Sequence, residues 1–177
     1  MHLLRTDRLL LRPFNGDDAD FVYDVYSRWE VQRYIGAVPR VMASMSEAFD
    51  RIHAWRTIDD GVHGAWAVTE ADSGKLLGTV LLKFIPASGS DLTVAPHGDT
   101  EIGWHFHPDA WGKGCATEAA SAVLDHAFAQ GLDRVVAVTD PLNLASQRVC
   151  ERIGMVHQGV TEEYYNARCE LFVARTD

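Results

Sequence analysis

The stretch "EIGWHFHPDAWGKGCATEAA", residues 101–120, decides the fold. Thr100 and the apolar residues up to Phe106 occupy every second position, and polar or ionisable residues, Glu101 among them, occupy most of the positions between. This period of two predicts a strand over residues 100–106 that is buried on one face and carries ionisable groups on the other. Pro108 ends the predicted strand.

Two glycines follow this strand and precede a helix. Apolar residues recur at helical spacing over residues 116–130, and Gly131 ends the pattern. Gly112 and Gly114 leave the loop without bulky side chains, so backbone N–H groups and the positive end of the helix dipole can meet an anion there. Lys113 can add charge. The spacing fits neither the P-loop nor the dinucleotide fingerprint, and a plain tight turn explains the same residues equally well.

The rest of the chain alternates between strand-like and helix-like segments. The expected elements are a strand at 9–12, helices at 17–26 and at 46–58 with a cap at Ser46, hairpin strands at 65–69 and 76–84, a loop at 85–98, a strand at 134–139, a helix at 143–153, and two strands within 161–175 around Asn166 and Ala167. The sequence therefore predicts one α/β (α+β) domain over residues 1–177, built on a mixed sheet.

Charge and hydropathy exclude several classes of protein. The 177 residues include 16 basic and 25 acidic side chains, for a net charge of −9, which argues against nucleic acid or an anionic membrane as partner. A cationic acceptor such as an amine is tolerated better. No apolar run approaches the ~18 residues of a membrane span, and the N-terminus lacks a signal-peptide core. A cytoplasmic protein is expected.

The cysteines and histidines do not predict a metal site. Cys115, Cys150 and Cys169 lie far apart with no Cys-x-x-Cys pair, which is typical of reduced thiols. His105 and His107 share one strand face and could bind zinc, but no third ligand follows at a recognisable spacing. We therefore expect no metal.

A second stretch, "DPLNLASQRVCERIGM" at residues 140–155, bears on ligand binding. Asn143 and Ser146 lie three residues apart at a predicted helix start, so their side chains can share one face and reach a ligand along it. Alternatively, Asn143 is an ordinary N-cap without a ligand.

Three stretches in order resemble one family. They are "LRTDRLLLRPF" (4–14), "EIGWHFHPDAWGKGCATEA" (101–119) and "NLASQRVCERIGM" (143–155). Together they are similar to the GNAT acyl-CoA N-acyltransferase superfamily, and within it to the branch of ribosomal-protein (alanine and serine) N-terminal acetyltransferases. The resemblance covers nearly the whole chain. It implies a single-domain GNAT fold, a central mixed and mostly antiparallel sheet flanked by helices, acetyl-CoA as co-substrate, and a possible homodimer.

The resemblance also assigns a cofactor site. The family's pyrophosphate loop, Gln/Arg-x-x-Gly-x-Gly/Ala, falls on Trp111, Gly114 and Ala116, with tryptophan in place of the basic or amide residue. It implies that the backbone from 112 to 117 holds the CoA diphosphate, and that the pantetheine arm fills a gap between the strands at 100–106 and 134–139. The implied cofactor contacts are Phe106, Trp111, Gly112, Lys113, Gly114, Cys115, Ala116, Thr117, Asn143 and Ser146.

Acetyl transfer to an amine requires a base. Deprotonating an ammonium at pH 7 costs about 4–5 kcal/mol for a lysine-like amine and about 1 kcal/mol for an α-amine. Glu101 falls where the superfamily often places its acid–base carboxylate, so it is the expected base, acting directly or through water. The alternative is an ordinary salt-bridged glutamate.

The leaving thiolate needs a proton or a hydrogen bond. Many relatives use a tyrosine at the position of Cys150, so that acid is missing here. The resemblance assigns the role to Ser146, and Tyr164 or Tyr165 are possible substitutes. A covalent route through Cys115 or Cys150 is less favoured, because a helix-facing cysteine usually acts as a small hydrophobe.

The acceptor site is expected beside the first helix and its following loop, which border the active site in this family. The expected residues are Trp29, Glu30, Arg33, Tyr34 and Tyr165. The sequence thus predicts an enzyme that acetylates a primary amine, on a protein N-terminus or a small molecule. Two alternatives remain: a non-catalytic acyl-CoA sensor, and a resistance enzyme acting on an antibiotic or polyamine.

Overall fold

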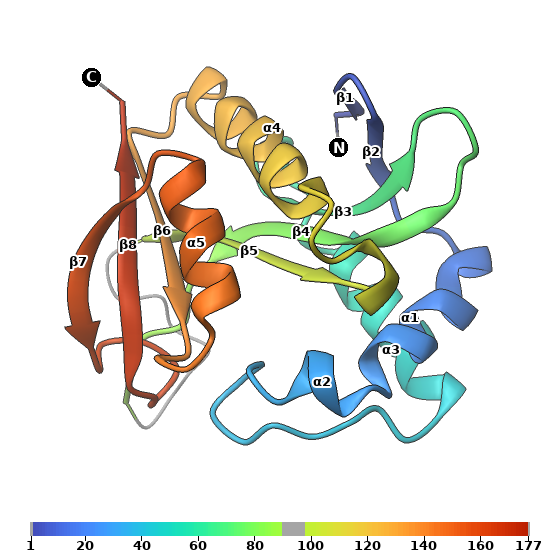
Figure 1. Cartoon of the computed structure of the whole chain (residues 1–177), viewed down its shortest axis with the longest axis horizontal. Helices are drawn as coiled ribbons and strands as arrows, with labels where there is room; N and C mark the ends of the chain where they lie inside the picture. Colours follow the sequence, from blue (N-terminus) through green and yellow to red (C-terminus); the bar gives the residue numbers. More distant parts are fainter. Residues whose placement is uncertain (1, 90–97, 177) are drawn as a thin grey trace.

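The structure is a computed structural model that describes residues 2–89 and 98–176. Within these ranges, eight strands form one sheet in the order β1-β2-β3-β4-β5-β6-β8-β7 (Figure 1). The strands are β1 (Leu4–Arg5), β2 (Leu9–Pro13), β3 (Gly64–Glu70), β4 (Leu76–Phe84), β5 (Thr100–Phe106), β6 (Arg134–Thr139), β7 (Val156–Thr161) and β8 (Cys169–Arg175). The α-helices are α1 (Ala19–Tyr26), α2 (Trp29–Gln32), α3 (Met45–Arg56), α4 (Cys115–Ala129) and α5 (Leu144–Arg152), and 3-10 turns cover Gly16–Asp18 and Pro108–Ala110.

Helices cover both faces of the sheet. Trp66 and Val68 of β3 pack into a core shared with α4 and α5, whereas Ala65 and Ala67 pack into a second core with α1 and α3. The strand pairs are antiparallel except β5 and β6, which run parallel and are connected through α4. The predicted mixed, mostly antiparallel sheet flanked by helices is confirmed.

Several element boundaries differ from those predicted. Helix α3 begins at Met45, and its cap is Ser44 rather than Ser46, because the Ser44 hydroxyl accepts the Glu47 backbone N–H at 3.4 Å. The short elements β1 and α2 have no counterpart among the predicted elements, since neither is long enough to show a period. The greater part of the predicted loop 85–98 lies outside the described residues.

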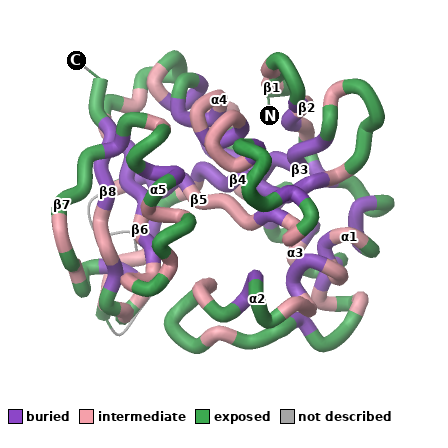
Figure 2. The backbone as a smooth tube through the Cα atoms, viewed as in Figure 1, coloured by how far each residue is buried: buried purple, intermediate pink, exposed green. Residues whose placement is uncertain are grey.

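One of the two predicted C-terminal strands is wrong in position. The chain from 162 to 168 is the connection between β7 and β8, and Tyr165 and Asn166 adopt left-handed backbone conformations there, with φ of 59° and 53°. Strand β7 therefore lies almost entirely before residues 161–175, in which both C-terminal strands were expected. It is an edge strand with mostly exposed residues (Figure 2), so it lacks the apolar alternation from which strands are predicted.

The face of β5 that carries Glu101 and His105 is also covered by other parts of the chain. Glu101 is only 9% exposed, and the Nδ1 atom of His105 lies 2.8 Å from the hydroxyl of the buried Tyr26. Helix α1 thus packs on the face that carries the ionisable groups. Burial, reinforced by the positive charges of Arg51 and Lys83, lowers the pKa of His105 to about 3, so its imidazole is neutral.

Strands β4 and β5 approach closely at Gly78. A Cβ on Gly78 would lie 2.6 Å from the backbone oxygen of His105 and from the Phe106 ring, whereas a Cβ on Gly103 would meet nothing within 4 Å. We expect Gly78→Ala to lower the free energy of unfolding by about 1–3 kcal/mol. Gly103→Ala, the matched control on the neighbouring strand, should change it by less than about 0.5 kcal/mol. Urea unfolding measures both, and equal effects would contradict the steric argument.

The neutral His105 predicts a pH dependence of stability. Its pKa is about 3 when folded and about 6.5 when unfolded, so between these values the unfolded chain binds more protons. Stability contributed by this group is present above pH 6.5 and is lost as the pH falls toward 3. His105→Gln should reduce the slope of unfolding free energy against pH, between pH 6 and 4, by up to about 1.4 kcal/mol per unit. Replacement of the exposed His53 is the control, and an unchanged slope for His105→Gln refutes this account.

Candidate active site

The glycine loop leads directly into the longest helix of the described chain. Gly112 and Gly114 have φ of 72° and 79°, which disfavours side chains with a Cβ, and Gly114 is the N-cap of α4. A Cβ at Gly112 would meet nothing within 4 Å. The first backbone N–H groups of a helix have no partner within it, so this open loop can present N–H groups to an anion.

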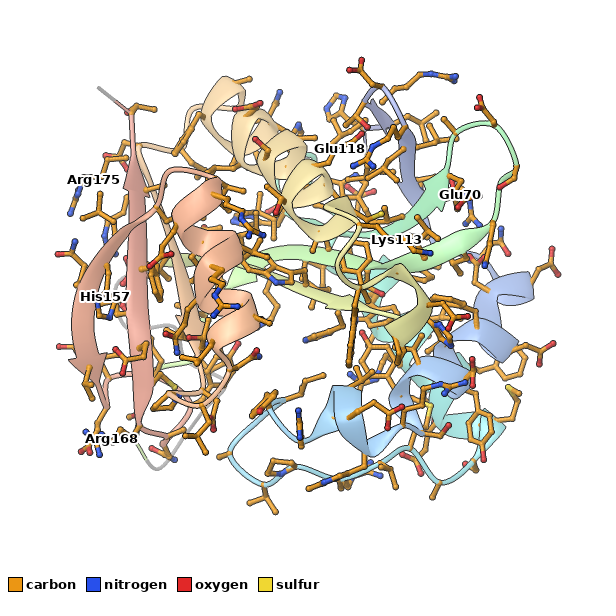
Figure 3. All side chains as sticks on the ribbon, in the orientation of Figure 1. Glu70, Lys113, Glu118, His157, Arg168 and Arg175 are labelled. Carbon is orange, nitrogen blue, oxygen red and sulfur yellow. The ribbon has the colours of Figure 1, made fainter. Side chains whose placement is uncertain are left out.

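An ion pair braces this loop against the N-terminal strands. Arg8 donates to Glu118 through Nε at 2.7 Å and to the Lys113 carbonyl through Nη1 at 3.1 Å, and Thr6 also donates to Glu118. In Figure 3, Lys113 lies on the loop before α4 and Glu118 on the side of α4 that faces β1 and β2. The sequence alone did not point to Arg8 or Glu118, because the two are far apart along the chain.

A cleft of about 780 Å³ opens beside the braced loop. Its lining combines glycines, hydroxyls and both signs of charge. The lining residues are Arg5, Thr6, Arg8, Gly112, Gly114, Thr117, Glu118, Ser121, Ala122, Asp125 and Arg152. Arg8 is paired with Glu118, so the guanidinium groups of Arg5 and Arg152, beside a glycine loop at a helix N-terminus, are the ones that suit a phosphate ligand.

Trp111 links the loop to the end of β5. Its indole Nε1–H donates to the Phe106 carbonyl at 2.8 Å, while the side chain stays 47% exposed. The Phe106 side chain is buried in the core beside Cys115. The structure therefore brings together the predicted residues Phe106 and Trp111, and it uses one lone pair of the Phe106 carbonyl to do so.

The parallel strands β5 and β6 are joined at one point. Their register is the single pair Glu101↔Val136, although β5 continues to Phe106 and β6 to Thr139. On its other side β6 pairs with β8 along its whole length. Beyond Glu101 the two strands therefore present backbone groups to one another without a regular ladder, which is an arrangement that an extended ligand can enter.

Glu101 lies where the strands separate, and it is held by two side chains. Lys83 Nζ is 3.2 Å from Glu101 Oε2 and donates to the Tyr165 hydroxyl at 2.7 Å, and Tyr165 donates to the same Oε2. No other described residue hydrogen-bonds the carboxylate. Oxygen Oε1 is thus available for a further proton or water. Sequence reasoning missed Lys83, since it comes from the neighbouring strand without a motif.

The two tyrosines considered as acids have other partners. The Tyr164 hydroxyl donates to Asp99 at 2.7 Å, and the Tyr165 hydroxyl donates to Glu101. Burial, together with the adjacent carboxylates, raises the pKa of both phenols, that of Tyr165 far above its ordinary value. Both are therefore hydrogen-bond donors in the structure and poor proton donors to a thiolate.

Asn143 and Ser146 meet at the start of α5. Asn143 is the N-cap, and its side-chain oxygen accepts the Ser146 backbone N–H at 3.2 Å. Gln147 of the same turn donates to the carbonyls of Asp140 and Pro141. Asn143 therefore acts as an N-cap through Oδ1, as the alternative interpretation predicted. Its hydrogen bond and those of Gln147 fix the turn between β6 and α5.

The cysteines are packed in the core. Cys150 is fully buried and Cys115 is 7% exposed, and both contact the cluster beneath α4. Burial raises the pKa of Cys150 to about 12, so its thiol stays protonated at neutral pH. A protonated, buried thiol is a poor nucleophile, and this geometry does not favour a covalent route through Cys150.

The predicted acceptor residues lie on and after α2. Trp29 is 55% exposed, Glu30 and Arg33 are exposed, and the Arg33 guanidinium lies 4.6 Å from the centre of the Tyr34 ring. No hydrogen bond or ion pair in the described chain joins these residues to Tyr165. Tyr165, the fifth predicted acceptor residue, is instead hydrogen-bonded to Lys83 and Glu101.

The histidine pair has partners other than a metal. His107 Nε2 is 3.0 Å from Asp24, and His105 contacts Tyr26. Among residues 2–89 and 98–176, no group of three or more His, Cys, Asp or Glu side chains is placed to hold a metal ion. In the same ranges, none of the helices combines the length and apolarity that a membrane crossing requires.

Comparison with known proteins gives a family match. The model of the acetyltransferase (GNAT) domain matches residues 8–156. An uncharacterized N-acetyltransferase of Bacillus subtilis (strain 168), YoaA, is 32% identical over 164 residues, which is 92% of this chain and 87% of that protein.

Solved structures share the fold at low identity. RimL, a ribosomal L7/L12 α-N-protein acetyltransferase in complex with coenzyme A, superposes with a TM-score of 0.80 at 14% identity and covers 99% of both chains. The ribosomal-protein-S5-alanine acetyltransferase of Vibrio fischeri gives 0.76 at 19% identity, over 100% of this chain and 98% of that one. Because the family model matches most of its length, this chain belongs to the GNAT acetyltransferase family.

Proposed function

We propose that this protein transfers the acetyl group of acetyl-CoA to a primary amine by direct attack of the amine on the thioester. The observation that carries the proposal is the opening between β5 and β6, which has the glycine loop at one end and Glu101 at the other. A loop that can present backbone N–H groups to a phosphate and a carboxylate thus lie at the two ends of strand edges that have no regular ladder between them. This arrangement suits a long ligand with a charged head and a reactive tip.

In this proposal the diphosphate lies against the backbone from Gly112 to Thr117. The helix dipole and the N–H groups of α4 stabilise its charge, while Arg8 holds the loop in place through Lys113 and Glu118. The pantetheine arm extends into the opening beside Phe106, with Asn143 at its other side. Its amide groups can then bond the strand edges that β5 and β6 leave unpaired.

Glu101 is the proposed base. Its Oε2 is fixed by Lys83 and Tyr165, so Oε1 is the oxygen that receives the acceptor's proton, directly or through one water. The cost of deprotonation at pH 7 is about 1 kcal/mol for an α-amine and about 4–5 kcal/mol for a lysine-like amine. A protein N-terminus or another weakly basic amine is therefore the less demanding acceptor.

Direct attack conserves atoms and charge without a covalent enzyme intermediate. The neutral amine nitrogen attacks the thioester carbonyl, a C–N bond forms, and the C–S bond breaks with its electron pair on sulfur. The proton that converts the acceptor's ammonium to the neutral amine leaves before attack, through Glu101 to solvent. The nitrogen becomes positively charged on attack and loses its second proton to Glu101 as the amide forms, while the Ser146 hydroxyl donates a hydrogen bond to the departing thiolate. The proposed wall that receives the acceptor is formed by Trp29, Glu30, Arg33 and Tyr34.

The catalytic role of Glu101 is tested by Glu101→Gln. We expect kcat for acetyl transfer to fall by about 10²–10⁴-fold, with coenzyme A affinity retained, measured with a panel of amines. Glu170→Gln is a matched control, because Glu170 is a glutamate of strand β8 whose carboxylate is hydrogen-bonded to His157 of β7. If the wild-type protein binds coenzyme A but acetylates none of the amines, the sensor alternative is favoured. If Glu101→Gln keeps full activity, Glu101 is not the base.

The role of the loop is tested by Gly112→Asp. A carboxylate on this open, left-handed position repels the diphosphate, so coenzyme A affinity should fall by about tenfold or more, equivalent to ~1.4 kcal/mol. Gly74→Asp is the control, since Gly74 has the same φ of 72° and equally open surroundings in the β3–β4 turn. Calorimetric titration measures both, and similar affinities in the two variants would place the diphosphate elsewhere.

A further inference from the structure

The hydroxyl of Thr139 is buried without a partner. Thr139 is 7% exposed, and no described residue hydrogen-bonds its Oγ1. Native structures rarely leave a buried hydroxyl unsatisfied, because the group loses its water and gains nothing in return. The one other buried side-chain nitrogen or oxygen in this condition within the described chain is Oε1 of Gln32.

Thr139 is the last residue of β6, at the opening. Its backbone pairs with Glu170 of β8 on one side. On the other side the pairing of β6 with β5 is at Val136, three residues earlier. Side chains alternate along a strand, so Thr139 shares the face of Val135 and Ala137, which pack in the core with α4 and α5. The hydroxyl therefore lies at the end of β6 that is not paired with β5, on the face of the sheet covered by α4 and α5.

The surroundings of Thr139 are fixed. The turn that follows is closed by Gln147, which donates to the carbonyl oxygens of Asp140 and Pro141 at 3.3 and 3.1 Å, and by the Leu142 N–H, which donates to Asp140 Oδ1 at 2.8 Å. The unpartnered hydroxyl thus lies on a segment held from both directions. A preorganised group of this kind loses little freedom when a ligand binds.

We propose that Thr139 Oγ1 hydrogen-bonds an amide of the pantetheine arm of coenzyme A. This inference rests on the proposed function. Three residues of strand separate Thr139 from the Glu101↔Val136 pair, a distance of about 10 Å, so the hydroxyl lies between the reactive end at Glu101 and the diphosphate loop. The arm is the part of the carrier that spans this interval. Its amides offer both N–H and C=O, and a hydroxyl can serve either.

The test compares two ligands in calorimetric titrations. Coenzyme A contains the arm, and adenosine 3′-phosphate 5′-diphosphate is the same nucleotide without it. We expect Thr139→Val to weaken coenzyme A binding by about five- to tenfold and to leave nucleotide binding unchanged. Thr139→Ser keeps the hydroxyl and should stay within about twofold of wild type. Thr139→Ala provides a second variant without the hydroxyl, should valine prevent folding.

Stability gives an independent readout. Since the hydroxyl has no partner among the described residues, Thr139→Val should leave Tm unchanged or raise it, whereas loss of a structural hydrogen bond would lower it. Unchanged coenzyme A affinity, or equal losses for both ligands, overturns the inference and leaves the proposed function standing. Wild type that binds neither ligand overturns both.

Discussion

The parallel pairing of β5 with β6, the one parallel pair among the described strands, is the constraint on which the candidate site depends. Parallel neighbours require a crossover connection, and here α4 provides it between β5 and β6. The crossover places the N-terminus of α4 just beyond the end of β5, so the glycine loop, the helix dipole and the opening between the strands follow from one connection. An antiparallel hairpin at this point would close the gap and leave no helix end beside it.

The candidate base depends on a second, less regular feature. Tyr165 reaches Glu101 from a connection in which Tyr165 and Asn166 both have positive φ, a conformation that costs free energy in non-glycine residues. Asn166 exchanges hydrogen bonds with Gly89, and its backbone N–H donates to Ser88. These contacts fix the strained turn against the segment that follows β4. The turn thereby positions the Tyr165 hydroxyl on the Glu101 carboxylate.

The central part of the fold and site could be predicted from the sequence for a physical reason. The alternation in β5, the glycines at 112 and 114, and the helical periodicity of α4 are local signals, and each survives in the structure. The missed features are non-local or lack apolar patterning. Lys83 and Tyr165 meet Glu101 only when β4 and the β7–β8 connection pack around it, and the exposed edge strand β7 shows no apolar stripe.

Cys150 occupies the position where many relatives have a tyrosine that protonates the leaving thiolate. The energetic cost of lacking this acid is small. A thiol of pKa about 8.5 costs only about 2 kcal/mol to ionise at pH 7, so a departing thiolate needs a hydrogen bond more than a full proton. The buried Cys150 thiol is a weak donor, whereas the Ser146 hydroxyl at the start of α5 is a stronger one. Deprotonation of the amine costs about twice as much as this for a lysine-like acceptor and about half as much for an α-amine. In the proposed function, the carboxylate of Glu101, fixed by Lys83 and Tyr165, serves the amine, and the Ser146 hydroxyl at the start of α5 serves the thiolate.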